Sequence, residues 1–354
     1  KQKLKVASKR PICWGSGLLA LDVILNGSPS TPPKLTAGGS CGNVMAILAY
    51  LKWDSYPIAR LKDDDASKEI LEDLHRWGVR TDFVLTESTG STSIIIHRIL
   101  KNKAGQSVHR FEFRNPKTGK WFPGYKPFLS KEVPELLKKM PTPSVYYFDR
   151  INRAAIDLAV EAKKLGAVVF FEPSSISDPN LFEQCLQIAD IIKFSSERIS
   201  DYKTKYKKSK VYLEIETLGK EGLNFRCKKS NSPKWNHVSS FIISDHNDSA
   251  GAGDWCSAGI IDKLCRDGIK AFRQKGIREI KAGLLVGQIL GAMNCFFDGA
   301  RGIMYNVDEN TFQTAIKKND LKSIELSKDK LFKTGVATYK EFDFKVIETR
   351  IFGS

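Results

Sequence analysis

The chain has 354 residues, and its 42% hydrophobic and 27% charged residues are typical of a soluble globular protein with a large core, which excludes a disordered or fibrous protein. No apolar run is long enough to span a bilayer, and the charged start lacks the apolar run of a signal peptide, so we expect a cytoplasmic protein without membrane partners. The net charge is +16, and the seven scattered cysteines lack a CxxC pair, which predicts reduced core thiols rather than a metal site.

The first part of the chain alternates apolar segments with helices. Apolar residues recur with helical spacing over residues 43–52, and again on a helix that ends at Gly78. Residues 24–36 are rich in Pro, Ser and Thr, and residues 91–128 contain two β-prone runs with no helix between them. Antiparallel ribbons inserted into an α/β body are typical of a lid over an active site, although a plain surface hairpin has the same pattern.

From about residue 145 the sequence alternates short apolar strands with helical patterns. We expect strands at 145–148, 168–171, 191–193 and 211–217, with helices at 152–165 and 179–188. The spacing leaves room for crossover helices, which predicts a mostly parallel sheet covered on both faces. The fold class is therefore α/β, and we expect a single domain over residues 1–354.

A loop of small residues, Asp-Ser-Ala-Gly-Ala-Gly-Asp at 248–254, directly precedes an apolar-periodic helix at 255–265. Small residues let backbone N–H groups approach an oxyanion, and the start of a helix favours negative charge. Asp254 would repel a phosphate, so we interpret it as a base for a hydroxyl that attacks phosphorus. Gly-Ala-Gly turns also open helices that bind nothing, so a bare GAGD would not establish a site.

The longer string DSAGAGDWCSAGII resembles the second signature of the PfkB-type carbohydrate kinases, the ribokinase-like family. The resemblance matches Asp254 to the catalytic base, and Gly251, Ala252 and Gly253 to the anion hole for the migrating phosphoryl group. It implies a three-layer α/β/α sandwich with a mostly parallel central sheet and a small β-sheet lid. It also implies ATP and Mg²⁺, and leaves open a monovalent cation such as K⁺.

The first signature of the same family is matched in part near the start of the chain. Asp22, the pair Gly38 and Gly39, and Asn43 offer polar groups and close backbone approach to a sugar, although a turn and a helix cap explain them equally well. By resemblance these four residues hold the substrate. Cys41 departs from the pattern, because the family usually has Gly, Ala or Pro there.

Within the predicted lid, the run FEFRNP at 111–116 resembles a stretch of the fructokinases and ketodeoxygluconate kinases. In those relatives an Arg of this stretch reaches the substrate, so the resemblance places Arg114 in the substrate site. The alternative is a solvated charge on a strand.

For the nucleotide, Thr217, Gly219 and Gly222 form a T-x-G-x-x-G turn after a strand, where ligands of open parallel sheets bind. The resemblance matches this turn to the nucleotide site and adds Asn294 near an adenine. The glycines at 283, 287 and 291 make one helix face smooth, which favours close helix packing.

The family's Asn-x-x-Glu motif, which organises magnesium, is altered here. Ser195 stands in the Asn position and is expected on the nucleotide side, but the Glu position holds Arg198. Either Glu197 serves from the neighbouring position, with a metal contact through water, or the alignment slips by one residue. Trp255 is also bulky where the family has a small residue. Magnesium handling is therefore the weakest part of the match.

The resemblance predicts transfer of the γ-phosphoryl group of ATP to a hydroxymethyl group of a small sugar or sugar acid. A nucleoside kinase would need an apolar slot, to which Cys41 and the lid would belong, and a pseudokinase with a binding or regulatory role fits the altered magnesium motif. The basic run at 202–210 is interpreted as a solvated loop rather than a nucleic-acid site. A homodimer through the lid is a further alternative.

Overall fold

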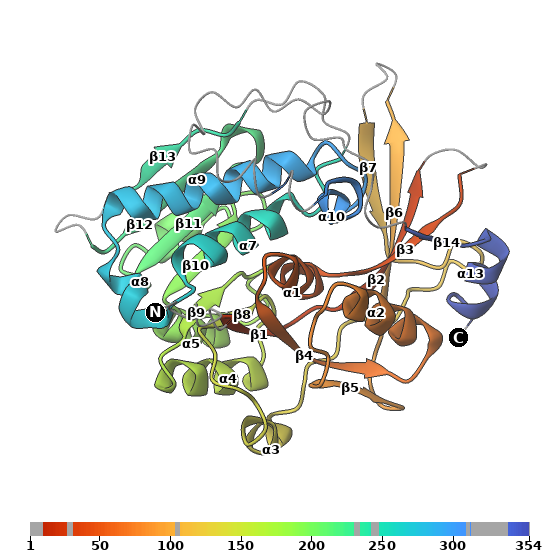
Figure 1. The fold of residues 1–354 in the computed structure, drawn as a ribbon, viewed down its shortest axis with the longest axis horizontal. Coiled ribbons are helices and arrows are strands. Elements are labelled where there is room, and N and C mark those ends of the chain that lie inside the picture. The colour runs from red at the N-terminus through yellow and green to blue at the C-terminus, as the bar shows by residue number, and fades with distance from the viewer. Residues whose placement is uncertain are drawn as a thin grey trace, which may run out of the picture.

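Two sheets organise the chain, and one of them is much larger than the other (Figure 1). The computed structural model describes residues 10–26, 31–102, 107–229, 234–241, 248–308, 312 and 339–353. In that part of the chain no helix has both the length and the apolar character needed to cross a membrane. All seven cysteines are described, and each is free and buried, which confirms the expected core thiols.

The larger sheet has nine strands in the order β13-β12-β11-β10-β9-β8-β1-β4-β5. All neighbours are parallel except β11–β12 and β12–β13, which are antiparallel. The predicted parallel sheet is thus confirmed, and two predicted strands have the expected bounds. Its strands are β1 (Ile12–Ser16), β4 (Asp54–Lys62), β5 (Val84–Glu87), β8 (Val145–Phe148), β9 (Val168–Phe171), β10 (Ile191–Ser195), β11 (Leu213–Thr217), β12 (Leu223–Cys227) and β13 (Asn236–Val238).

Apolar residues on both faces of this sheet form two cores. Tyr147 and Phe170 belong to one core, while their chain neighbours Phe148 and Phe171 belong to the other, because successive strand residues point to opposite faces. The first core is covered by α1 (Ser40–Tyr50), α2 (Asp65–Arg76), α7 (Ala252–Leu264), α8 (Gly268–Gln274) and α9 (Ile277–Asn294), and the second by α3 (Val133–Leu137), α4 (Arg153–Lys164), α5 (Pro179–Ile188) and α6 (Tyr202–Lys205). This is a three-layer α/β/α arrangement.

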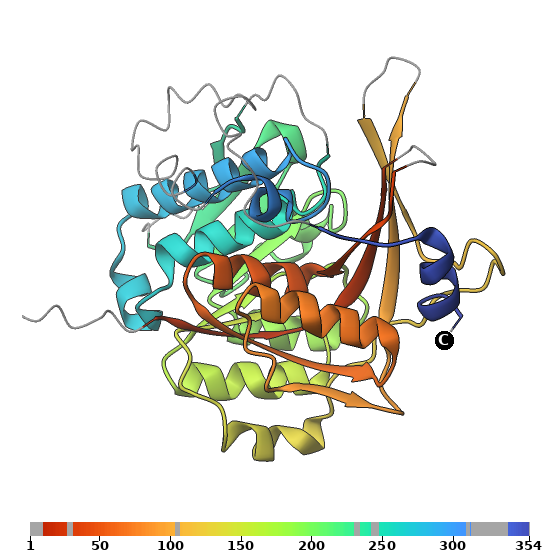
Figure 2. The same ribbon diagram turned by 45° about the vertical axis from the view of Figure 1, so that its right-hand side comes forward.

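The smaller sheet, called the lid sheet below, stands at one side of the main body (Figures 1 and 2). Its order is β14-β3-β2-β6-β7, with β2 parallel to β6 and the other pairs antiparallel. The helix α13 (Phe344–Arg350) lies on the side of this sheet away from the body in both views. The strands are β2 (Ala20–Asn26), β3 (Lys34–Gly38), β6 (Ser93–Lys101), β7 (Ser107–Glu112) and β14 (Lys340–Glu341).

The two predicted lid segments both enter this sheet, which confirms a small β-sheet beside the body. Residues 27–30 and 103–106 of those segments lie outside the described part. The prediction was incomplete, since the lid sheet also takes a strand from the C-terminal region, where β14 pairs with β3.

The glycines of α9 pack against α7, as predicted. A Cβ atom on Gly287 would lie 2.6 Å from the carbonyl oxygen of Cys256, and one on Gly291 would lie 2.7 Å from that of Ala252. The two helices therefore approach at backbone distance, and this contact fixes the start of α7.

Candidate active site

The start of α7 is set by a left-handed glycine. Gly251 has φ of 72°, and a Cβ atom there would lie 2.1 Å from the carbonyl oxygen of Ala300. Only glycine fits such a position without strain. Trp255 is fully buried and donates from Nε1 to the same carbonyl at 3.1 Å, so its bulk lies in the core rather than over the loop.

Asp254 lies in the first turn of α7 and meets Asn43 of α1. The Nδ2 atom of Asn43 donates to Oδ2 of Asp254 at 2.8 Å. Burial, with a smaller contribution from the charge of Glu172, raises the pKa of Asp254 to about 8. A carboxylate with such a pKa is a stronger proton acceptor than an ordinary one, as a general base requires.

Asp22 lies on β2, on the same side of the lid sheet as Gly38. A Cβ atom on Gly38 would lie 2.1 Å from the Asp22 carboxyl carbon, so the glycine makes room for that carboxyl group. Burial raises the pKa of Asp22 to about 7. Within the described residues, Oδ1 of Asp22 and Oδ1 of Asn43 are buried without a hydrogen-bond partner, so both oxygens have unused capacity to accept a hydrogen bond.

Asp149, which sequence reasoning missed, directly follows β8. Its Oδ1 accepts from the backbone N–H of Leu18 at 3.0 Å and its Oδ2 from Arg150 at 2.7 Å. Burial raises its pKa to about 6, and its charge raises the pKa of Asp254. An acid directly after an apolar strand was the available signal, since such residues lie at the carboxyl edge of a parallel sheet.

A buried ion pair lies close to the loop of residues 251–253. Lys193 of β10 is bonded to Glu172, which follows β9, and Glu172 also accepts from Ser257 at 2.5 Å and Tyr147 at 3.1 Å. The Lys193 Nζ atom lies 3.8 Å from where a Cβ of Gly253 would be. Burial opposes its charge, but Glu172 outweighs burial and raises the pKa of Lys193. Sequence reasoning missed both residues, although a lysine inside the apolar strand IIKFS was the signal.

The expected nucleotide residues meet at the ends of β10 and β11. Ser195 pairs in register with Thr217, whose hydroxyl donates to the Phe194 carbonyl at 3.3 Å. The turn that follows has Gly219 at φ of 58° with open space around it, and Gly222 at φ of 103° packed on β13. Since Ser195 is two residues beyond Lys193 on one strand, both face α7.

Two expected site residues have contacts elsewhere. Asn294 is fully buried and its amide bonds to the backbone of neighbouring loops, and the nucleotide contact expected from the resemblance stays a prediction. Arg114 stacks on Trp121 at 4.2 Å and donates to the Gly119 carbonyl at 3.2 Å. Its neighbour Asn115 bonds to the Phe352 carbonyl at 3.0 Å, which ties this stretch to the end of α13.

No three His, Cys, Asp or Glu side chains are gathered to hold a metal ion in the described ranges. Glu197 is exposed just beyond β10, and its backbone N–H donates to the Ser195 hydroxyl at 3.3 Å. A water-mediated metal contact from Glu197 therefore stays a prediction.

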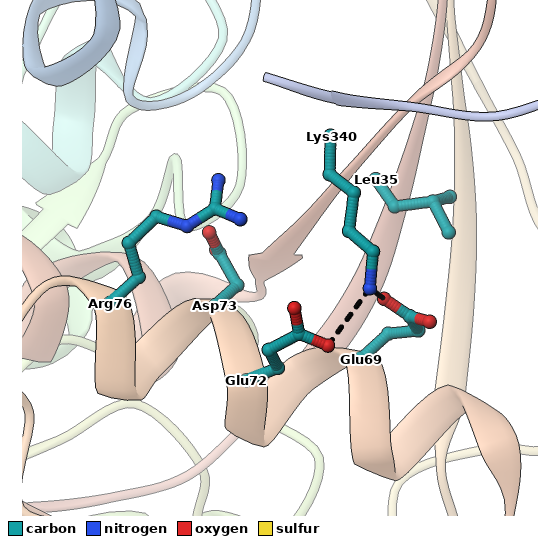
Figure 3. Close-up of a pocket in the computed structure, with 6 residues that line it drawn as sticks. All are labelled: Leu35, Glu69, Glu72, Asp73, Arg76 and Lys340. Carbon is teal, nitrogen blue, oxygen red and sulfur yellow. Dashed lines mark hydrogen bonds and ion pairs between the residues drawn. The ribbon is translucent and has the colours of Figure 1, made fainter. Parts of the chain in front are cut away.

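Arg301 is buried behind Asp22 and closes the edge of β3. Its Nη2 donates to the Ala37 carbonyl at 2.6 Å and to Asp73 at 2.5 Å, while Asp73 accepts the Ala37 N–H at 2.8 Å. Asp73 also lines the cavity in Figure 3, where Lys340 bonds to two glutamates of α2 at 2.8 Å each. Its lining differs from the residues around Asp254 and consists of Leu35, Glu69, Glu72, Asp73, Arg76 and Lys340.

The basic run at 202–210 is more ordered than the expected solvated loop. It begins with α6, where Tyr202 is fully buried and its hydroxyl donates to Glu214 at 2.9 Å. Lys203 pairs with Glu216, and Lys205 pairs with Asp201 at 2.6 Å. Tyr202 thus belongs to the core and Tyr206 packs against it partly buried, while the lysines at 205, 207, 208 and 210 are exposed.

No family model matches the chain, and no curated protein matches it. Among solved structures, aminoimidazole riboside kinase from Salmonella enterica, complexed with aminoimidazole riboside and an ATP analog, is 17% identical with a TM-score of 0.63 over 86% of this chain and 99% of that one. Ribokinase from Arabidopsis thaliana with ribose and ATP is 17% identical, with a TM-score of 0.62 over 87% and 99%. A fructokinase double mutant from Vibrio cholerae O395, in a form with fructose, ADP and potassium ion bound, is 18% identical, with a TM-score of 0.60 over 82% and 94%. At these identities the shared feature is the fold, and this chain has the fold of the ribokinase-like kinases.

Proposed function

We propose that this chain transfers the γ-phosphoryl group of ATP to a hydroxymethyl group of a small sugar or sugar-like acceptor. One observation carries the proposal: Asp254, with its pKa raised to about 8, lies three residues beyond a left-handed glycine and is bonded to Asn43 at 2.8 Å. The arrangement joins a proton acceptor, a polar substrate contact and an anion-binding helix start. The structural neighbours act on, or are bound to, ribose, fructose and a riboside, which supports an acceptor of that class.

The acceptor side is formed by Asp22, Asn43 and the glycines Gly38 and Gly39. The unpartnered oxygens of Asp22 and Asn43 accept hydrogen bonds from hydroxyl groups of the acceptor and orient it. Asp254 then removes the proton from the attacking hydroxyl. The bond from Asn43 holds the Asp254 carboxylate in one orientation while it does so.

The phosphoryl side is formed by the loop Gly251, Ala252 and Gly253 at the start of α7. Its backbone N–H groups and the helix dipole stabilise the charge that spreads over the equatorial oxygens during transfer. The Lys193 ammonium beneath Gly253 adds a fixed positive charge to that region. Magnesium, bound chiefly to the phosphates of ATP, would neutralise further charge, and Glu197 is the residue we propose for contact through water. Ser195, Thr217, Gly219 and Gly222 would border the nucleotide.

The decisive experiment replaces Asp254 with Asn and measures phosphoryl transfer over a panel of sugars, sugar acids and nucleosides. We expect the unmodified protein to phosphorylate at least one panel member, and Asp254→Asn to lose about 10³-fold in kcat because the base is gone. ATP affinity, measured by thermal shift, should change little. Equal turnover in both proteins would contradict the proposed base, and no turnover with any acceptor would contradict the proposed activity.

A further inference from the structure

The amide of Asn294 joins two backbone loops that are distant in sequence. Its Nδ2 atom donates to the carbonyl oxygen of Ala250 at 2.9 Å and to that of Gly299 at 3.1 Å, and its Oδ1 accepts from the N–H of Ile303 at 3.2 Å. Chemistry settles which end of the amide is nitrogen, because carbonyl oxygens only accept and a backbone N–H only donates. All hydrogens of the amide are thereby used.

Asp248 binds the same two loops through their N–H groups. Its Oδ1 accepts from Ala250 and its Oδ2 from Gly299, both at 2.9 Å. Asp248 and Asn294 are both buried, with exposed fractions of 2% and 0%. The carboxylate of Asp248 thus binds the N–H groups of residues 250 and 299, and the amide of Asn294 binds their carbonyl oxygens. Together the two side chains hold the two loops against each other.

These bonds set the position of the anion-hole loop. Gly251 directly follows Ala250, and a Cβ on it would lie 2.1 Å from the oxygen of Ala300, which directly follows Gly299. The two loops are therefore in backbone contact where the loop turns into α7. Anything that separates residues 250 and 299 would displace the amides proposed to face the phosphoryl group.

The resemblance leaves open a monovalent cation such as K⁺, and the oxygens beside the loop are of the kind that bind one. Such a cation takes backbone carbonyl oxygens and carboxylates as ligands. Here the carbonyls of Ala250 and Gly299, with the Asp248 carboxylate nearby, form that donor set. However, the nitrogen of Asn294 already lies between the two carbonyls and presents a hydrogen to each. A cation at this point would overlap the amide, so the residues present do not fit it.

We propose that the Asn294 amide takes the place of a monovalent cation in this chain and holds the 250 and 299 loops together without one. The inference rests on the proposed function only for the role of residues 251–253 as an anion hole. The contact between the two loops affects the stability of the fold, which can be measured as a melting temperature without any substrate.

The test compares melting temperatures in KCl and in choline chloride at equal ionic strength, without nucleotide. The unmodified protein should melt at the same temperature in both salts. Asn294→Ala should melt roughly 5 °C lower in choline chloride, because two buried carbonyls lose their donor, and K⁺ should restore part of that loss. Asn294→Asp should respond more strongly to K⁺, since it adds a third oxygen beside the two carbonyls.

Asn306→Ala is the matched control. The Asn306 amide also donates to a backbone carbonyl, that of Gly302 at 2.8 Å, but within α10 (Gly302–Asn306), so its loss should not create a response to K⁺. A K⁺-dependent melting temperature in the unmodified protein would overturn the proposal. So would an Asn294→Ala protein that melts like its parent, or a pair of Asn294 variants that both ignore K⁺. If Asn294→Ala does not fold, the comparison of the unmodified protein with Asn294→Asp in the two salts tests the proposal.

Failure here is distinct from failure of the proposed function. A protein without kinase activity would still give the salt comparison, and a K⁺-dependent protein would still lose transfer in Asp254→Asn.

Discussion

The start of α7 and the lid sheet hold the two sides of the candidate site by different means. At α7 the important residues are consecutive, 251–254, and one left-handed glycine with its contact to Ala300 sets their positions. In the lid sheet, Asp22 lies on a strand whose neighbours come from residues 34–38 and 93–101, and Arg301 closes the sheet edge at Ala37. The first side depends on local backbone geometry, and the second on the assembly of distant segments.

This difference predicts how substitutions will act. Changes at α7 should alter the chemical step, because they move the groups that we propose to face the transferring phosphoryl. Changes in the lid sheet should alter acceptor binding, because its polar atoms are those that we propose to contact the acceptor. Measurement of kcat and KM for variants on each side separates the two effects.

After Asp254→Asn, the largest effect is expected for Gly251→Ala. A Cβ atom at this left-handed position collides with Ala300 at 2.1 Å, so the loop must move, and we expect a loss of at least about 100-fold in kcat with a lower melting temperature. Gly78→Ala is the matched control, because Gly78 is also left-handed, at φ of 77°, but a Cβ there meets nothing within 4 Å. If both variants lose the same activity, general backbone strain rather than loop displacement explains the loss.

The next effect tests the Lys193 charge. Lys193→Met alone would leave Glu172 buried without its partner, which destabilises the fold. We therefore pair it with Glu172→Gln, which keeps an acceptor for Tyr147 and Ser257. We expect the double variant to fold and to lose roughly 10-fold to 100-fold in kcat, because the positive charge near Gly253 is gone.

Glu172→Gln alone is the control for the double variant, since it retains the lysine. Recovery of parental kcat in the double variant would show that the ion pair only stabilises the fold. In Glu172→Gln alone, the acid limb of the pH profile should also move to lower pH, because the charge of Glu172 raises the pKa of Asp254.

The same difference between local and distant contacts decides which site residues can be predicted from the sequence. The loop and Asp254 are contiguous, and the strands at 145–148 and 168–171 have uninterrupted apolar runs, so local patterns sufficed. Asp149 and Glu172 are single acids after those strands, and their proximity to Asp254 depends on the order of the strands in the sheet. No local pattern reveals that order.

The pairing of β14 with β3 is still harder to predict from the sequence, because it joins residues about 300 positions apart through a strand of two residues. Asn294 shows a different limit. The sequence places it on a helix, but its contacts with residues 250 and 299 exist only once two loops are folded against that helix.

A smaller effect is expected on stability, from the raised pKa of Asp254. In the folded protein this acid releases its proton near pH 8 instead of near 3.8, so the parent loses stability as pH rises through that window. Asp254→Asn lacks the ionisation and should gain relative stability from pH 5 to pH 9, by about 2 kcal/mol after allowance for its partial exposure. Thermal unfolding of both proteins at these two pH values measures the gain. A difference that is constant with pH would show that Asp254 is not perturbed.

The smallest effect is expected for Arg114→Ala. The Arg114 guanidinium is engaged with Trp121 and Gly119 in a stretch tied to α13, so its loss should lower the melting temperature by only about 1–2 °C and leave the acceptor KM within about twofold. Asp22→Asn provides the contrast within the lid region, because it changes a buried acceptor atom without a partner and should raise KM at least about 10-fold. A larger KM effect at Arg114 than at Asp22 would mean that the 111–116 stretch leaves α13 and closes over the acceptor. The position of this stretch would then depend on the bound acceptor rather than on its packing against α13.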